Sequence, residues 1–303
     1  MRGYGYMKIY GIGNALLHYR EKKNISQPQV CEGICSEMTI SRMETGEREY
    51  DALISETLLS RVGKSTNRFE FVLNDEDYYL YRLRETIEEN IKNGNLDEAK
   101  KNIAEYEEIM PDIHDLHCQF LMYQKALLMQ EEGKEQDEIV QCLYHAINLT
   151  RSDFKEPTNG IRLYSTIEIK IIYELLQYEN YSEEVLQSVI RFVEKMYDEE
   201  EKSKILTPFQ LYIGRQYRDA ENWEKVDQIT ARAIELLQSG RTYTHLLEFH
   251  YMNLEARYHL GYETEPLLRC YEIYYMAQMV EDDGMMQKIQ QFCEEQLECQ
   301  III

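Results

Sequence analysis

Proline and glycine are scarce in this sequence, with 5 prolines and 14 glycines among 303 residues. A β-rich fold turns at short intervals and draws on these two residues for its turns. Leucine, isoleucine, glutamate, lysine, glutamine and methionine instead recur at helical spacing. The sequence therefore predicts an all-α fold of long helices and short turns. Its 44% hydrophobic content supplies a sizeable core and excludes disorder as the global state.

Long apolar runs are also missing. No segment approaches the roughly 20 apolar residues that a membrane span requires, and no signal peptide is visible. The seven cysteines are odd in number and far apart, which favours free thiols over a disulfide framework. We expect a cytoplasmic protein with reduced thiols and no membrane partner.

Motifs that carry catalysis or bind cofactors are lacking as well. There is no phosphate-binding glycine loop, no Gly-x-Ser-x-Gly elbow and no His-Glu-x-x-His pair. His245 and His250 stand outside any such context, and carboxylates are so abundant that adjacent pairs arise by chance. We therefore expect no enzymatic activity, no cofactor and no metal site.

Positive charge is limited, because 33 Lys and Arg stand against 55 Asp and Glu and give a formal net charge of −22. The imbalance is uneven: residues 1–68 hold ten basic and eight acidic residues, so nearly all of the acidity lies downstream. The acidic part is unsuited to nucleic acid despite the 25 tyrosines, which are expected to pack between helices. The N-terminal part remains suited to contact phosphates.

Three short helices are predicted near the N-terminus, over residues 14–23, 27–32 and 37–45. Ser26 and Gln29 fit a capping box at the start of the second helix, which Gly33 ends. Ser36 is the expected N-cap of the third helix, and Gly46 is placed to end it in the left-handed conformation. Two short helices joined through a glycine-containing turn form a unit that places the second helix in a major groove of DNA.

This segment resembles a known DNA-binding family. Its "SQ" and "ISRMETG" motifs, within residues 25–46, stand where the lambda-repressor-like (Xre) helix-turn-helix has Ser/Thr-Gln and Ile-Ser-Arg-Ile-Glu-x-Gly. The turn is one residue shorter than in the broad pattern, with Cys35 where a glycine is usual. A turn of that shape resembles the turn in the peptide-pheromone-responsive regulators of the Rgg and PlcR type. The resemblance implies a DNA-binding domain over residues 1–68.

Roles in DNA binding follow from helix direction together with the resemblance. The side chains expected to face base edges are Glu37, Met38, Ser41 and Arg42. Arg42 is expected to donate two hydrogen bonds to a guanine, and Glu37 to accept one from a cytosine amino group. Gln27 and Ser36 are expected to contact phosphates and set the orientation. The alternative is a three-helix packing unit that does not read DNA.

Other conspicuous residues in this segment are interpreted as structural. Arg20 and Glu44 match positions that in this family form an ion pair between the first and third helices, so we expect them to hold the fold. Cys31 and Cys35 are four residues apart, but no second ligand pair lies nearby. A small buried thiol at a helix crossing explains Cys31 better than a metal does.

Beyond residue 68, turn-like motifs recur about every 40 residues. They occupy residues 93–99, 131–138, 178–184, 220–226 and 260–266, each flanked by two amphipathic stretches. The fourth unit resembles a tetratricopeptide repeat, with Gly214, Tyr217, Trp223 and Ala233 at its small and aromatic positions. We therefore expect a right-handed tetratricopeptide-like solenoid of five helix pairs in a domain over residues 69–303.

The concave surface of such a solenoid suits an extended peptide, because polar side chains there can take over the peptide's backbone hydrogen bonds. The residues expected on that surface are Gln124, Tyr164, Leu211, Arg215, Arg218, Tyr251, Asn253, Glu255 and Tyr258. The alternative for the tyrosines is core packing between helices.

A helix-turn-helix followed by this array is the plan of the Rgg and PlcR type of regulator. The resemblance implies a homodimeric cytoplasmic transcription regulator whose solenoid binds a short signalling peptide and whose two heads bind an inverted repeat in double-stranded DNA. Two alternatives stay open: an array that docks a protein partner or only self-associates, and a protein that sequesters another regulator without reading DNA. A last helix over residues 283–300 precedes an apolar tail, Ile301–Ile303, which is expected either to cap the array or to join the dimer interface.

Overall fold

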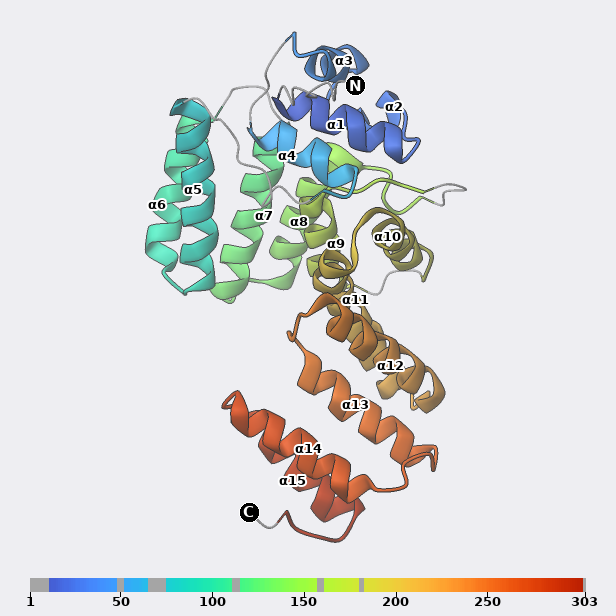
Figure 1. Cartoon of the computed structure of the whole chain (residues 1–303). Coiled ribbons are helices and arrows are strands. Elements are labelled where there is room, and N and C mark those ends of the chain that lie inside the picture. The colour runs from blue at the N-terminus through green and yellow to red at the C-terminus, as the bar shows by residue number, and fades with distance from the viewer. Residues whose placement is uncertain are drawn as a thin grey trace, which may run out of the picture. The chain divides into compact units, whose positions relative to one another are not determined.

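The computed structural model describes residues 11–47, 52–64, 75–110, 115–156, 161–179 and 183–301. Within these ranges the regular secondary structure is helical and contains no strand, which confirms the all-α prediction (Figure 1). None of the helices in these ranges combines the length and the apolar character needed to cross a membrane. The chain divides into two compact units, Met1–Met196 and Tyr197–Ile303. The predicted domain boundary after residue 68 lies outside the described residues.

Four helices open the first unit: α1 (Gly11–Lys22), α2 (Gln27–Cys31), α3 (Glu37–Glu44) and α4 (Ala52–Arg61). Both predicted caps are confirmed. Ser26 and Gln29 form the complete capping box of α2, and the Ser36 hydroxyl accepts from the Thr39 N–H at 3.2 Å at the start of α3. Gly46 ends α3 with φ +73°. The first helix begins at Gly11, three residues earlier than predicted. We refer to α1–α4 as the head.

The predicted ion pair between α1 and α3 is confirmed. Arg20 donates from Nε to Glu44 Oε1 at 2.6 Å and from Nη2 to Oε2 at 2.9 Å. The same guanidinium donates to the Ile25 carbonyl at 2.9 Å, and the Glu44 side chain is only 4% exposed. The hydrogen bonds to Glu44 raise the pKa of Arg20. This forked pair therefore fixes α3 on α1 with a defined orientation.

Three helix pairs complete the first unit: α5 (Asp75–Lys92) with α6 (Leu96–Ile109), α7 (Asp115–Glu131) with α8 (Gln136–Arg151), and α9 (Thr166–Leu176) with α10 (Glu183–Met196). The first two predicted turns lie between the helices of their pairs (Figure 1). The third lies between α9 and α10, and its residues 180–182 fall outside the described residues. A continuous core joins α5, α6 and α7, with Ile87, Ala99 and Tyr106 among its buried members.

The second unit consists of α11 (Glu199–Asp219), α12 (Trp223–Gly240), α13 (Leu246–His259), α14 (Pro266–Met279) and α15 (Asp283–Gln296). The last two predicted turns fall between α11 and α12 and between α13 and α14. Trp223 stacks on His259 with ring centroids 4.1 Å apart. Gly214 lies close to a neighbouring helix, because a Cβ there would fall 2.9 Å from the terminal methyl of Met252. Small and aromatic positions thus pack neighbouring helices as the repeat pattern predicted.

The last helix ends at Gln296, four residues before its predicted end. Cys299 and Ile301 are partly buried and pack against the core formed by α13, α14 and α15. Residues 302 and 303 lie outside the described residues. The start of the apolar tail therefore packs on the array. This agrees with the expectation that the tail caps the array.

Candidate functional site

The residues predicted to read bases share one side of α3. Glu37, Met38 and Arg42 are exposed, with Met38 64% exposed, and Ser41 is half-buried. The opposite side of α3 is buried through Ile40 and Met43. The helix therefore presents an arginine, a carboxylate and a thioether to a potential groove. Base contact by these residues stays a prediction.

The two residues predicted to contact phosphates also have partners within the head. Gln27 Nε2 donates to Glu44 Oε2 at 2.7 Å, which adds a third hydrogen bond to the Arg20–Glu44 pair. Ser36 caps α3, and its hydroxyl is 2.9 Å from the Thr39 hydroxyl. A glutamine amide has a second N–H, so Gln27 keeps a donor beyond Glu44. Both side chains therefore stand ordered at the helix starts where phosphate contacts are expected.

The cysteines of the helix-turn-helix behave as structural thiols. Cys31 is buried, and its Sγ lies 3.6 Å from the Pro28 carbonyl. Burial raises the pKa of Cys35 to about 12, with Cys31 as a smaller cause. Both thiols are therefore poor nucleophiles at neutral pH. Over the described ranges, no group of three His, Cys, Asp or Glu side chains is placed to hold a metal ion.

A buried arginine joins the head to the helix pairs of the first unit. Arg61, at the end of α4, is fully buried. Its Nη1 donates to the carbonyls of Val30, at 3.0 Å, and of Glu32. Its Nη2 donates to Glu168 Oε1 at 2.8 Å in the first turn of α9. One guanidinium thus connects α2, the turn after it and α9.

Glu168 is the centre of this cluster and is also fully buried. Besides Arg61, it accepts from the Thr150 hydroxyl at 2.8 Å and from the Ser165 N–H at 2.6 Å. Arg151 Nε lies 4.0 Å from the same carboxylate, and Arg151 Nη1 donates to Glu32 Oε2 at 2.9 Å. We call Glu32, Arg61, Arg151 and Glu168 the docking cluster.

The charges of the docking cluster support one another. Burial alone raises the pKa of Glu168, but Arg61, Arg151 and the Ser165 N–H outweigh it and hold the pKa below the ordinary value. Burial lowers the pKa of Arg61, while Glu168 opposes that effect. The carboxylate is therefore ionised at neutral pH between two guanidinium groups. Removing one partner leaves an uncompensated buried charge.

Local sequence patterns do not reveal the contacts of the docking cluster. Arg61 and Glu168 are 107 positions apart, so no local periodicity connects them. The only signal was the Ser-x-x-Glu pattern at residues 165–168, which forms a complete capping box for α9. That pattern indicates a helix start but not a buried partner for its glutamate.

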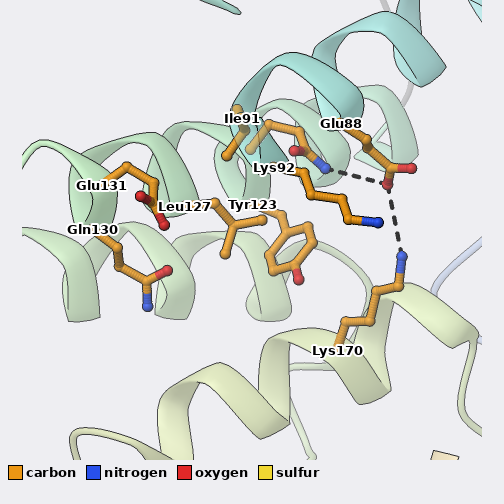
Figure 2. A pocket seen from close by; sticks show the side chains of 9 residues that line it. Glu88, Ile91, Lys92, Tyr123, Leu127, Gln130, Glu131 and Lys170 are labelled. Atoms are coloured by element: carbon orange, nitrogen blue, oxygen red, sulfur yellow. Dashed lines mark hydrogen bonds and ion pairs between the residues drawn. The ribbon is translucent and has the colours of Figure 1, made fainter. Parts of the chain in front are cut away.

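A pocket of about 340 Å³ opens between α5, α7 and α9 (Figure 2). Its lining residues are Glu88, Ile91, Lys92, Tyr123, Gln124, Leu127, Gln130, Glu131 and Lys170. Of these, only Gln124 was predicted as a ligand-binding residue. Three helices that each begin a pair thus line one cavity, as expected for the inner surface of a helix-pair array.

The polar groups of the pocket are unevenly paired. Gln124 is 1% exposed, and its Nε2 lies 3.5 Å from Glu88 Oε1. Its Oε1 has no hydrogen-bond partner within the part of the chain that the structure describes. Lys170 Nζ lies 3.7 Å from Glu88, and Gln130 Nε2 donates to the Tyr178 hydroxyl at 2.9 Å. Among the described residues, the pocket therefore has a buried acceptor without a donor.

In the second unit, several predicted peptide-binding residues lie on α11 and α13. Arg215 donates to Glu248 Oε1 at 2.5 and 3.1 Å. Arg218 lies 3.6 Å from Glu255, and burial raises the pKa of that carboxyl. These residues bring opposite charges together across two neighbouring helices.

Tyr251 and Tyr258, the two tyrosines of the second unit that were predicted to bind a peptide, are partly buried. Tyr251 packs edge-on against Phe292, and Tyr258 donates to the Gln296 carbonyl at 2.7 Å. Asn253 is 7% exposed and donates to Asp227 at 2.8 Å and to Thr230 at 3.0 Å. Peptide contact by all three stays a prediction, but each also has a partner within the second unit.

The expected exposure of Tyr164 and Leu211 is wrong. Tyr164 is fully buried, its hydroxyl donates to Ser188 at 3.1 Å, and its ring meets Phe192 edge-on. Leu211 is 2% exposed in the core that joins α11, α12 and α13. Tyr164 precedes α9, and Leu211 faces the partner helix of its pair. Both side chains therefore belong to the core and are not exposed on the concave surface.

Comparisons with known proteins bear on the fold. No protein-family model and no curated protein matches the sequence. The structure of PlcR from Bacillus thuringiensis, in complex with the peptide PapR7 and DNA, matches with a TM-score of 0.50 at 15% identity, over 92% of this chain and 98% of that chain. The SHP pheromone receptor Rgg2 of Streptococcus dysgalactiae matches with a TM-score of 0.48 at 14% identity, over 95% and 100%. ComR from S. thermophilus, in complex with DNA and its signalling peptide ComS, matches with a TM-score of 0.44 at 16% identity, over 93% and 98%. The chain therefore shares the fold of the PlcR structure, a helix-turn-helix head followed by tetratricopeptide-like helix pairs.

Proposed function

We propose that this chain is a DNA-binding transcription regulator whose helix-pair array senses a short signalling peptide. The observation that carries the proposal is the exposed face of α3, with Glu37, Met38 and Arg42 on a head whose inner side is fully packed. The fold shared with PlcR, which was solved with a peptide and DNA, supports the same function. We assign no enzymatic activity, and we place the protein in the cytoplasm.

We further propose that the protein acts as a homodimer. One small head with a slight excess of basic residues binds phosphates weakly, and the downstream part is strongly acidic. Two joined heads reach half-sites one helical turn apart, and the second contact benefits from a high effective concentration. Dimerisation thus lets an acidic protein bind a polyanion through two local surfaces.

Selection of bound fragments from a random DNA library tests the proposal. Purified full-length protein is used at two salt concentrations, with and without a mixed pool of synthetic heptapeptides. We expect enrichment of an inverted repeat whose half-sites are about 10 base pairs apart, centre to centre, or a multiple of that distance.

The outcomes separate the candidate functions. An enriched inverted repeat supports a dimeric, sequence-specific regulator, and a peptide-dependent change in enrichment supports peptide sensing. Enrichment that no peptide changes favours an array that docks a protein partner or only self-associates. Absence of enrichment in every condition contradicts DNA reading and favours a protein that sequesters another regulator.

A further inference from the structure

The buried amide of Gln124 is the first sign of a ligand in the pocket between α5, α7 and α9. Buried polar atoms are nearly always hydrogen-bonded, but Gln124 Oε1 has no partner among the described residues, and Gln124 lines this pocket. The Nε2 group of the same amide is oriented toward Glu88. The oxygen is therefore positioned to accept from an N–H group that enters the pocket, such as a peptide backbone N–H.

A cation, Lys92, lines the same pocket as this acceptor. Figure 2 shows the Lys92 ammonium projecting into the space next to Tyr123, while Lys170 faces Glu88. Lys170 and Glu88 lie 3.7 Å apart, whereas Lys92 forms no ion pair with the described residues. A ligand carboxylate near Lys92 gains a charge-assisted contact without displacing an existing pair.

The apolar lining and the distribution of acidic groups orient the ligand. Ile91, Leu127 and the ring of Tyr123 supply an apolar floor. Figure 2 shows Glu131 and Gln130 at one end and Glu88 with Lys170 at the other, with Leu127 and Tyr123 between them. Glu131 repels a carboxylate at its own end, whereas Glu88 at the other end is paired with Lys170 at 3.7 Å. The ligand carboxylate therefore belongs near Lys92, and the rest of the peptide extends past Gln130.

The size of the pocket limits what it holds. A volume of about 340 Å³ lies at the low end for ligand pockets and suits the last one or two residues of a peptide. We propose that this pocket binds the C-terminal end of a short peptide. The free carboxylate pairs with Lys92, a backbone N–H donates to Gln124 Oε1, and an apolar last side chain packs on Leu127 and Tyr123. This inference rests on the proposed peptide sensing and names the residues that recognise the peptide's end.

The test uses full-length protein and a library of random heptapeptides displayed through their N-termini, so that each C-terminus is free. Enriched peptides are synthesised as the acid and as the C-terminal amide, and their dissociation constants are measured by calorimetry. We expect an apolar last residue, and about tenfold weaker binding of the amide than of the acid.

Three variants locate the contact. Lys92→Gln weakens binding of the acid about tenfold and leaves binding of the amide nearly unchanged, because the carboxylate and the ammonium form one interaction. Gln124→Met weakens both forms without lowering the thermal unfolding midpoint, because it removes an unpaired buried acceptor from the free protein. Leu127→Trp fills the apolar floor and weakens both forms. Lys134→Gln, an exposed lysine in the turn between α7 and α8, serves as the matched control and leaves both affinities unchanged.

Failure of the pocket and failure of peptide sensing give different results. Peptides that enrich but respond neither to amidation nor to the Lys92 and Gln124 variants overturn the pocket assignment and leave peptide sensing standing. A library in which no peptide enriches overturns both. A peptide that responds equally to Lys92→Gln and Lys134→Gln senses only the general charge of the surface, which also contradicts the proposal.

Discussion

At the scale of single residues, a substitution at Gly33 tests how closely the turn after α2 in the head approaches α8. Its φ is +69°, and a Cβ there falls 2.1 Å from the Thr150 carbonyl oxygen at the end of α8. Gly94 has nearly the same φ, +73°, but no atom of the described residues lies within 4 Å of its Cβ position. An alanine at Gly94 therefore meets only backbone strain, about 1–2 kcal/mol, whereas an alanine at Gly33 also clashes with a backbone atom.

We expect Gly33→Ala to lower the free energy of unfolding by about 1–3 kcal/mol more than Gly94→Ala does. Urea titration followed by circular dichroism measures both variants under the same conditions. Equal losses for the two variants contradict close contact between the turn after α2 and α8.

Arg42 is the second residue to test, because it is exposed on the face of α3 proposed to read bases. Arg42→Lys keeps the positive charge but loses the two-donor fork that matches a guanine. We expect the variant to lose discrimination at one position of the selected site, by about 1–3 kcal/mol, while its salt dependence stays unchanged. Repeating the DNA selection with the variant measures both effects. An unchanged preference at every position shows that Arg42 does not read a base.

At the scale of elements, the docking cluster determines how α4 is held against α9. Glu168→Gln leaves Arg61 and Arg151 buried without their shared counter-ion, so we expect a loss of about 3–5 kcal/mol in the free energy of unfolding. Hydrogen exchange of the α4 amides should accelerate together with this loss. Glu98→Gln, which breaks an exposed pair with Lys101, is the control and should leave both measurements unchanged. Wild-type exchange rates in α4 of the Glu168 variant contradict a docking role for the cluster.

The docking cluster also predicts a direction for pH dependence. The folded pKa of Glu168 is below its ordinary value, so the carboxylate contributes stability at pH values above the unfolded pKa of about 4.3. This contribution is lost as the pH falls through the lower folded pKa. We expect the protection factors of the α4 amides, which correct the exchange rates for their intrinsic pH dependence, to stay constant between about pH 7 and 5 and to fall below about pH 4. In Glu168→Gln the acid-dependent part attributed to this carboxylate should be absent.

At the scale of the whole molecule, the uneven charge predicts a strong dependence of DNA affinity on salt. Only residues 1–68 have a slight basic excess, and the net charge of the chain is −22. If two heads together make about six phosphate contacts, affinity should fall roughly a thousandfold between 50 and 200 mM salt. Fluorescence anisotropy with the selected site measures the slope. A slope near zero contradicts phosphate contact by the heads.

Residues that signal structure locally were predicted well from the sequence. Ser26, Gln29 and Ser36 act on N–H groups three residues away, so the caps and starts of α2 and α3 were visible in the sequence itself. The turns of the array were visible for the same reason. The Arg20–Glu44 pair followed from the family resemblance, which supplied the long-range contact that local pattern lacks.

Residues whose environment depends on distant segments were predicted poorly. Tyr164 and Leu211 were placed on a groove because helical spacing shows which residues share a face, but not which neighbour covers that face. The pocket combines residues of α5, α7 and α9, of which only Gln124 had been singled out. Arg61 and Glu168 meet only after the head and the helix pairs have folded together. Such contacts depend on how helices stack, which spacing within one helix does not specify.

The helix α9 has one further consequence. Glu168, in its first turn, holds the head through Arg61, while Lys170 lines the pocket two residues later, about 200° around the same helix. If the pocket binds a peptide and α3 binds operator DNA, as proposed, a displacement of α9 that improves one of these contacts and alters the other gives the two ligands a coupling free energy. Thermodynamic linkage makes that coupling reciprocal: whatever factor a bound peptide contributes to operator affinity, the operator contributes to peptide affinity. If the coupling is favourable, the operator-bound protein would keep its peptide longer than the free protein does, and if it is unfavourable, the operator would release the peptide.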